Sequence, residues 1–442
     1  MAGAQAQAVP SSRKKFLKNL TVLVGGTASS RVIGILAAPI LTRIYDPADF
    51  ALLAVVVALA SLFIPIASLS YEQAIAVSQR QSESDNLFIV SLLLPAVLGL
   101  VLVLVGFFFG DILATMLRNA ELAAWIWAVP LFVVIRGWLK AGSYYCVRKS
   151  AFSLISAVAV AEALATAGAK LGAAHIWGAS SATLLFGGLF GVTLGGVMFA
   201  IVIWFTTFRA VVKKVSVSGM LAGIKGYKEF PLFNSWTLLV NAVAENVVLL
   251  LFSGFFSPAI VGAYSLANRM VNMPAAYVGS NFSKAFLGHA AEHHRRGRAL
   301  SRTLVQGTAA LAGVGVVPFA ALFLFGTEIF GFVFGSSWMT AGRYAEIIAP
   351  GLFFVLINKP AAATYSIYRK VRERLIYSVL YTIARVAGIV IGLMRFGDPA
   401  ACLAILAAVM VIFNCFFIGF AYTFTLRGDS DVAEARDSQS LR

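Results

Sequence analysis

Charged side chains are scarce in this sequence. Asp, Glu, Lys and Arg make up 12% of its 442 residues, whereas soluble globular domains carry roughly 25%. Hydrophobic residues make up 60%, and the mean hydropathy is +0.86. Short alternating segments of the kind that build membrane β-barrels are also missing. These features exclude a soluble domain, and the sequence predicts an all-α integral membrane protein.

Motifs for catalysis and metal binding are missing as well. The three cysteines, Cys146, Cys402 and Cys415, contain no C-x-x-C pair, so neither a disulfide framework nor a zinc site is indicated. His289 and His293 flank Glu292, but no third fixed ligand is evident, and a solvated basic loop explains them better. We expect no enzyme, no metal, no cofactor and no nucleic-acid partner.

Phosphate-binding loops are equally missing, because the sequence contains no G-x-x-x-x-G-K-[ST] motif. Its one glycine-rich run, "GGLFGVTLGG", places Gly187, Gly191 and Gly195 at intervals of four residues. This spacing is typical of a face of small residues that packs closely against another membrane helix. We therefore interpret it as a packing surface rather than a nucleotide site.

What the sequence does contain is twelve apolar runs long enough to cross a bilayer as helices. Their residues are 16–41, 49–78, 87–109, 121–145, 152–171, 177–205, 229–253, 258–283, 302–325, 343–367, 374–394 and 400–426. With both termini cytoplasmic, 24 of the 35 basic residues fall on inner segments and 5 on outer ones. This bias is the positive-inside pattern of membrane proteins, and it supports the count of twelve.

The two halves of the chain resemble each other. Residues 46–75 align with residues 257–286, and "YYCVRK" (144–149) resembles "YSIYRK" (365–370). Because six spans per half give both halves one orientation, we expect two lobes related by a pseudo-two-fold axis along the membrane normal, with a central cleft. The expected parts are a disordered N-terminal leader, an N-lobe, a cytoplasmic linker, a C-lobe and a cytoplasmic tail, at 1–12, 13–208, 209–228, 229–426 and 427–442.

The six basic residues that belong to neither the inner nor the outer segments lie well within the predicted spans: Arg31, Arg136, Lys140, Arg269, Lys359 and Arg385. A cation at the bilayer centre costs at least about 2.5 kcal/mol, so such residues are usually paired or functional. Only three acids lie at similar depth, so a cationic, water-filled cavity that attracts phosphate is one interpretation. Ion pairing or snorkelling is the other. The predicted cavity residues are Arg31, Arg136, Arg269, Lys359 and Arg385.

The three acids are Glu72, Glu162 and Glu245. A carboxylate beside a membrane cavity can carry protons or bind Na⁺, so each is a candidate for ion coupling. Structural ion pairing is the alternative for all three. For Glu72, near the inner end of its span, the alternative is contact with interfacial water or a pair with Arg31.

At this point the residues suggest a family. "LTRIYDPADF" (41–50) followed by "YEQAI" (71–75) resembles the first hairpin of bacterial polysaccharide and oligosaccharide flippases, the Wzx-like branch of the multidrug/oligosaccharidyl-lipid/polysaccharide exporter superfamily. Ala51 replaces the usual glycine. "YYCVRKSAF" (144–152) and "VGAYSLANRMVNMP" (261–274) are similar to later segments of that family.

The resemblance implies a MATE-like fold of twelve helices in two lobes. It further implies that an undecaprenyl-diphosphate-linked oligosaccharide repeat unit moves from the cytoplasmic to the periplasmic leaflet of the bacterial inner membrane, by alternating access coupled to H⁺ or Na⁺. The product would be O-antigen, capsule or exopolysaccharide, and other polysaccharide assembly proteins would be partners, besides membrane lipids.

Three alternatives stay open. One is a multidrug exporter, although cationic drugs prefer an acidic cavity. Another is an exporter of peptidoglycan precursors, whose members usually have more than twelve spans. The third is a membrane polysaccharide polymerase, which usually needs a large outer loop that this sequence does not contain.

Overall fold

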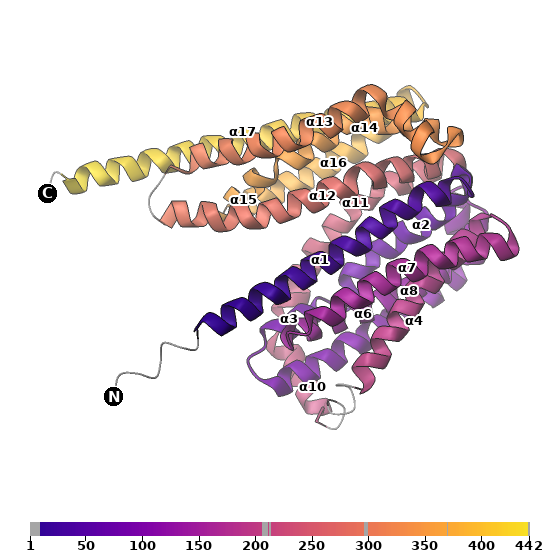
Figure 1. Ribbon diagram of the computed structural model, residues 1–442, viewed down its shortest axis with the longest axis horizontal. Coiled ribbons are helices and arrows are strands. Elements are labelled where there is room, and N and C mark those ends of the chain that lie inside the picture. Colours follow the sequence, from indigo (N-terminus) through magenta and orange to yellow (C-terminus); the bar gives the residue numbers. More distant parts are fainter. Residues whose placement is uncertain (1–8, 206–210, 212–213, 296–298, 369, 441–442) are drawn as a thin grey trace. The chain divides into compact units, whose positions relative to one another are not determined.

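Helices make up almost all of the computed structural model, which describes residues 9–205, 211, 214–295, 299–368 and 370–440. Turns connect the helices, and no strand occurs within these ranges (Figure 1). The prediction of an all-α protein is therefore confirmed. Part of the predicted leader (residues 1–8), part of the predicted linker and the last two residues of the tail lie outside the described residues.

The chain divides into two compact units, residues 1–262 and 263–442. The first contains α1 (Val9–Thr42), α2 (Pro47–Phe63), η1 (Ile64–Ile66), α3 (Tyr71–Val77), α4 (Gln81–Met116), α5 (Glu121–Trp125), α6 (Ala128–Arg148), α7 (Phe152–Trp177), α8 (Ser181–Ile203), α10 (Val217–Gly226), η3 (Phe230–Asn234) and α11 (Ser235–Phe255). Helix α12 (Pro258–Arg295) begins in the first unit and continues in the second, which contains α13 (Leu300–Phe334), η4 (Ser336–Trp338), α14 (Met339–Ile357), α15 (Lys359–Ile367), α16 (Val371–Arg395) and α17 (Pro399–Ser440).

Within the described residues, nine helical segments are long and apolar enough to cross a membrane. The chain is thus a multi-pass membrane protein. Three further predicted spans, 16–41, 121–145 and 258–283, fall on α1, on α5 with α6, and on α12. Helix α11, which the repeat assigned to the second lobe, packs on α2 in the first unit. The count of twelve and the lobe boundaries stay predictions.

In the first unit, α7 packs along both α8 and α1 (Figure 1). The glycines predicted to form a packing face of α8 do lie against α7. A Cβ at Gly187 would lie 2.7 Å from the Cα of Lys170, and one at Gly195 would lie 2.9 Å from the Cβ of Glu162. Only glycine allows helices to approach this closely, so the predicted packing face is confirmed.

The second predicted span, 49–78, is not one continuous helix. Helix α2 ends at Phe63, the short helix η1 contains Pro65, and α3 begins only at Tyr71. Between them, Leu69 (φ 49°) and Ser70 (φ 61°) adopt left-handed backbone conformations that non-glycine residues rarely take. The prediction of an unbroken span is wrong here. Proline lacks an N–H donor and its ring crowds the preceding turn, and two left-handed residues then redirect the chain.

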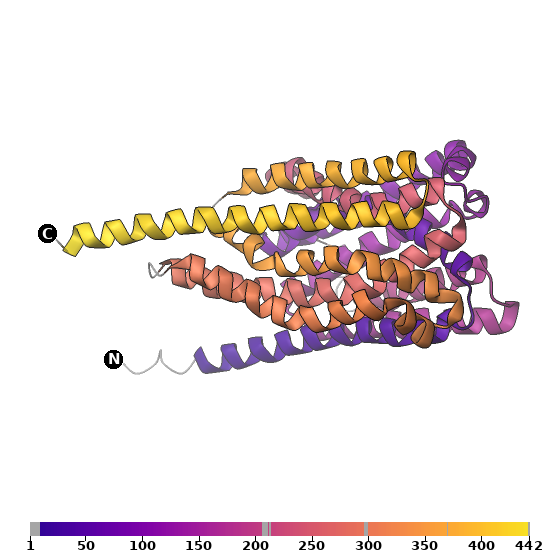
Figure 2. The ribbon, with the colours of Figure 1, turned by 90° about the horizontal axis from the view of Figure 1, so that it is seen from above.

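In the second unit, α13 packs on α14, and both α14 and α16 pack on α17. Helix α17 continues well past α16 toward the C-terminus (Figure 2). Its Asp429 carboxylate accepts hydrogen bonds from the backbone N–H groups of Leu300 (2.7 Å) and Ser301 (2.9 Å). These bonds satisfy two donors that the start of α13 would otherwise leave unpaired.

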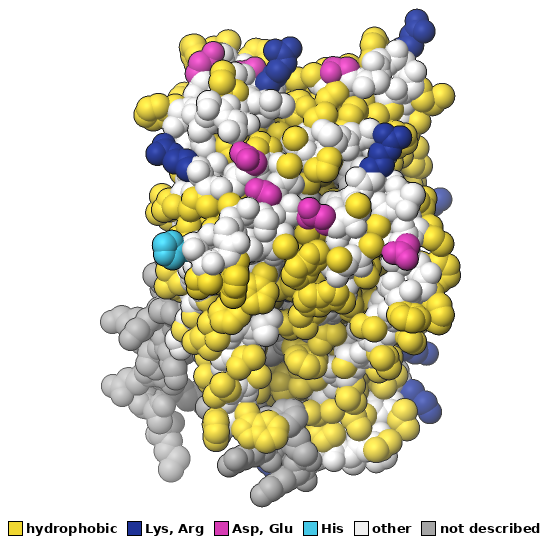
Figure 3. Space-filling view, turned by 90° about the vertical axis from the view of Figure 1, so that its right-hand side faces the viewer, with side chains coloured by type: hydrophobic (Ala, Val, Ile, Leu, Met, Phe, Trp, Pro, Cys, Tyr) yellow, Lys and Arg dark blue, Asp and Glu magenta, His cyan; other side chains and the backbone are white. Residues whose placement is uncertain are grey.

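The surface carries large exposed apolar side chains, as expected of a protein that contacts lipid. Phe107, Phe332 and Met394 are each at least 80% exposed. On the face that Figure 3 shows, a few charged side chains lie among many hydrophobic ones. Ordinary soluble proteins avoid large exposed apolar areas, so the surface agrees with a membrane environment.

The glycine face of α8 leads to a stability prediction. We expect Gly187→Ala to lower the free energy of unfolding by about 1–3 kcal/mol, because the new methyl group would overlap the α7 backbone. The matched control is Gly172→Ala on α7, where no heavy atom lies within 4 Å of the added Cβ. Thermal unfolding in detergent, followed by size-exclusion chromatography, measures both. Equal melting temperatures for the two variants would contradict the close packing.

Candidate functional site

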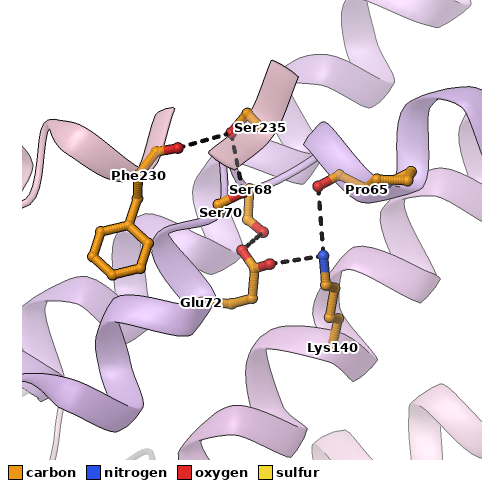
Figure 4. A network of polar contacts seen from close by, with 7 residues as sticks. All are labelled: Pro65, Ser68, Ser70, Glu72, Lys140, Phe230 and Ser235. Atoms are coloured by element: carbon orange, nitrogen blue, oxygen red, sulfur yellow. Dashed lines mark hydrogen bonds and ion pairs between the residues drawn. The ribbon is translucent and has the colours of Figure 1, made fainter. Parts of the chain in front are cut away.

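A buried carboxylate lies directly after the break in the second span. Glu72 on α3 is fully buried, and its Oε1 lies 2.7 Å from Nζ of Lys140 on α6. The hydroxyl of Ser68 donates a hydrogen bond to Oε2 of Glu72, and Lys140 also donates to the carbonyl of Pro65 at 3.4 Å (Figure 4). The pair and its hydrogen bonds therefore neutralise a charge that hydrocarbon would otherwise strongly disfavour.

The break in the helix makes this arrangement possible. The turn that contains Ser68 and Ser70 joins η1 to α3, and Glu72 lies in the first turn of α3. A discontinuous membrane helix leaves backbone carbonyls available for other partners, and the Pro65 carbonyl accepts from Lys140. The hydroxyls of Ser70 and Ser235 lie 3.1 Å apart, so the same turn also has a polar contact with α11 (Figure 4).

A second ion pair joins α6 to α7. Nη2 of Arg136 lies 2.7 Å from Oε1 of Glu162. Arg136 and Lys140 are one helical turn apart on α6, so they project from the same face. The Glu162 side chain packs over Gly195 of α8, where a Cβ would lie 2.9 Å from the Glu162 Cγ. The glycine face of α8 thus leaves room for this carboxylate.

A cavity of about 310 Å³ connects the two ion pairs. The side chains of Arg136 and Lys140 are 39% and 25% exposed, whereas that of Glu162 is 16% exposed. The cavity lies between α6, α7 and η1, and its lining residues are Ile64, Arg136, Leu139, Lys140, Ser143, Ile155, Val158, Ala159 and Glu162. Its lining is mostly apolar, and its polar members include two partly accessible cations, Arg136 and Lys140.

The other candidates of the first unit lie elsewhere. Arg31 on α1 and Glu245 on α11 are both exposed. Neither is among the residues that line the cavity. Of the residues predicted to bind substrate or ions, the structure brings together Arg136, Glu162 and, through Lys140, Glu72.

The candidates of the second unit lie on three helices. Arg269 is exposed on α12. Lys359, half-buried at the start of α15, lies close to Gly279 of α12, where a Cβ would be 3.0 Å from its Cγ. Arg385, half-buried on α16, lies over the ring of Tyr381, with its guanidinium carbon 5.5 Å from the ring centroid.

Two expectations for Glu72 change. Because Glu72 is fully buried, the interpretation that it reaches interfacial water is wrong. Its ion-pair partner in the structure is Lys140, not the arginine considered from the sequence. Lys140 was not among the predicted site residues. The interval of four residues between Arg136 and Lys140 was the available signal that both share one helix face.

Comparison with known proteins gives a family match and a shared fold. A family model described as "Polysaccharide biosynthesis protein" matches residues 40–343. No curated protein matches the chain by sequence.

Solved structures with the same fold include an inward-facing multidrug resistance transporter of the MATE family (13% identity, 91% of this chain and 95% of that chain, TM-score 0.69). The lipid II flippase MurJ in an inward closed conformation is similar as well (13% identity, 93% and 90%, TM-score 0.70). So is a MOP superfamily transporter from Pyrococcus furiosus (14% identity, 94% and 95%, TM-score 0.59). Identities this low show the fold alone, which is MATE-like and shared with transporters and a flippase.

The two ion pairs differ in burial, which leads to a prediction about stability. We expect Lys140→Met to lower the free energy of unfolding by about 3 kcal/mol, since it leaves a buried carboxylate without its cation. The double variant Glu72→Gln/Lys140→Met should recover more than half of that loss, because the glutamine removes the charge. Unfolding in mixed detergent micelles measures both.

The matched control is the more exposed pair. Arg136→Met should destabilise the protein less, because water at the cavity can solvate the remaining Glu162. If Lys140→Met and the double variant unfold alike, or if Arg136→Met is the more harmful change, the assigned burial of the Glu72 charge is wrong.

Proposed function

Since the chain belongs to the family of polysaccharide biosynthesis proteins, we propose that it is a flippase for a lipid-linked oligosaccharide. It moves an undecaprenyl-diphosphate-linked repeat unit from the cytoplasmic to the periplasmic leaflet of the bacterial inner membrane, with both of its own termini cytoplasmic. The family match supports a role in a saccharide pathway. The MATE-like fold supports transport rather than a chemical reaction.

The observation that carries this proposal is the cavity lined by Arg136 and Lys140. A diphosphate must lose much of its hydration to cross a bilayer, and arginine binds phosphate oxygens through two parallel hydrogen bonds. In the resting protein the carboxylates of Glu162 and Glu72 neutralise these cations. The cations are therefore held in place at low cost until an anionic headgroup replaces the carboxylates.

This exchange of partners supplies a route for coupling to an ion. When a phosphate takes Arg136 from Glu162, the carboxylate is left without its cation in an apolar bundle. Such a carboxylate binds H⁺ or Na⁺, because an unpaired charge there is costly. Substrate binding and cation uptake then favour each other. Of the three acids that are candidates for coupling, Glu162 is the one that lines the cavity.

The other intramembrane cations extend this role. We propose that Arg31, Arg269, Lys359 and Arg385 attract the diphosphate or acidic sugars along the path of alternating access. Other proteins of polysaccharide assembly would act before and after this step. A peptidoglycan-precursor flippase is the second candidate, favoured by the likeness to MurJ; its substrate would also need cations to neutralise a diphosphate.

The flippase proposal predicts a defect in cells. In a strain that lacks the chromosomal gene, Arg136→Ala/Glu162→Ala should lower surface polysaccharide at least about tenfold, because a phosphate loses a charged hydrogen-bonding partner. Undecaprenyl-diphosphate-linked units should accumulate in the inner leaflet. Polysaccharide gels and lipid extracts measure the two effects.

Arg343→Ala is the control for this experiment, because Arg343 is exposed on α14. This variant should restore surface polysaccharide fully. Arg136→Lys should restore an intermediate amount, because lysine keeps the positive charge but cannot donate the two parallel hydrogen bonds of a guanidinium group. Normal polysaccharide from the double variant, present in the membrane at wild-type amount, would refute the role of the cavity. Dye sensitivity with normal polysaccharide in the deletion strain would indicate a multidrug exporter instead.

The coupling proposal has its own test in reconstituted vesicles. We expect Glu162→Gln to keep binding of undecaprenyl diphosphate but to lose the stimulation of transport by an imposed H⁺ or Na⁺ gradient. Glu245→Gln, which changes an exposed acid on α11, should keep that stimulation. A fluorescent undecaprenyl-diphosphate saccharide and a leaflet-specific quencher follow the transport. If Glu162→Gln responds to the gradient like the wild type, coupling does not use this carboxylate.

A further inference from the structure

One face of α16 carries a row of aromatic and polar side chains, and the cation argument does not explain its two tyrosines. Tyr377, Tyr381 and Arg385 follow each other at intervals of four residues, so they lie on a single stripe of the helix; we call them the tyrosine stripe. The rings of Tyr377 and Tyr381 are stacked, with centroids 5.8 Å apart and an interplanar angle of 20°. The Arg385 guanidinium lies over the Tyr381 ring.

The stripe is separated from the lipid-facing side of the same helix. Other positions on α16 carry large apolar side chains that are between 40% and 58% exposed: Leu375, Ile376, Val379, Leu380 and Ile383. Arginine is costly in hydrocarbon unless it has a polar task, and so is a tyrosine hydroxyl that finds no hydrogen-bond partner. Gathering them on one face, away from the apolar side chains, indicates that this face serves a polar partner.

Helix α17 supports the stripe from behind. The Phe413 ring lies 5.6 Å from Tyr381, and the Phe417 ring lies 4.3 Å from Tyr377. Tyr365 of α15 then stacks on Phe417 at 4.4 Å and 7°. Tyr365 and Phe417 are buried and form the base, whereas Tyr377, Tyr381 and Phe413 are only half-buried. The base is ordinary core packing, and the half-buried rings remain accessible to a ligand.

One polar atom in the stripe lacks a partner. The Tyr377 hydroxyl is buried and has no hydrogen-bond partner among the described residues. Leaving a buried hydroxyl unpaired costs about 1–3 kcal/mol, and native structures rarely do so. Phenylalanine would fill the same space without that cost. A ligand hydroxyl that enters between the side chains covering this atom would satisfy Tyr377.

We propose that the tyrosine stripe binds the saccharide part of the lipid-linked substrate. Sugar rings present apolar C–H groups on their faces and hydroxyl groups at their edges. The C–H faces suit the electron-rich faces of Tyr377 and Tyr381, and an edge hydroxyl can pair with the Tyr377 hydroxyl. Arg385 at the end of the stripe then binds the first phosphate or an acidic sugar. This assignment rests on the proposed flippase function.

The test compares two lipids that differ only in the sugar. The probes are the lipid-linked repeat unit, extracted from source cells that lack this protein, and undecaprenyl diphosphate. Their affinities for the purified full-length protein are measured in detergent by native mass spectrometry. We expect the wild type to bind the glycosylated lipid at least about tenfold more tightly. Tyr377→Ala/Tyr381→Ala should bind both lipids equally, with unchanged affinity for undecaprenyl diphosphate.

Further variants separate recognition from folding. Tyr381→Leu keeps a bulky side chain against Phe413 and should still lose most of the preference. Tyr377→Phe keeps the ring and should lose only the part that the hydroxyl contributes. Tyr422→Ala, at an exposed tyrosine of α17 outside the stripe, should behave like the wild type.

The outcomes distinguish this inference from the function on which it rests. A wild type that binds both lipids equally, or stripe variants that keep the preference, would overturn the sugar site and leave the flippase proposal intact. A wild type that binds neither lipid would overturn both.

Discussion

Holding charge inside an apolar bundle is the constraint on which the first unit depends. An unpaired charge there is costly, and a pair is tolerated only when its remaining hydrogen-bonding groups are also satisfied. For Glu72, the Lys140 ammonium lies 2.7 Å from Oε1 and supplies the opposite charge, Ser68 donates a hydrogen bond to Oε2, and Lys140 reaches the Pro65 carbonyl as well. Several unusual features of the backbone follow from this requirement.

The broken second span is the clearest of them. A continuous helix would use the Pro65 carbonyl in its own ladder and would set the direction of Glu72 by helical periodicity alone. The short helix η1 and the left-handed residues Leu69 and Ser70 interrupt the helix. The Pro65 carbonyl is then available to Lys140, and the direction of Glu72 no longer follows from the periodicity of α2. Left-handed conformations at non-glycine residues cost free energy, and they persist where surrounding contacts stabilise them. Here those contacts are the polar network itself, so strain and ion pair support each other. The glycine face of α8 has a similar role for Glu162, because it leaves space for the side chain.

The sequence predicts the features that composition and local spacing determine. Apolar runs identify the membrane helices, and the spacing of Gly187, Gly191 and Gly195 identifies a packing face, because both signals lie within one segment. The ion pairs could not be predicted in the same way. Glu72 and Lys140 are far apart in sequence, and which acid meets which cation depends on how α3, α6 and α7 pack. The break at η1 could not be predicted for a related reason. Hydropathy measures how apolar a segment is, and a broken helix is as apolar as a straight one.

The two units also differ in how they accommodate polar groups. In the first, Arg136 and Lys140 are each neutralised by a carboxylate, so the energy of the site depends strongly on charge. In the second, Arg385 lies over a tyrosine ring, and its neighbours on the stripe are aromatic. Charged groups of an ion pair can bind a phosphate or a cation, whereas aromatic faces can bind the C–H surface of a neutral sugar ring. The proposed substrate, with a charged headgroup and a largely neutral saccharide, would need both kinds of contact. A chain that carried only cations could hold the diphosphate but would have little means of sensing whether the saccharide is attached.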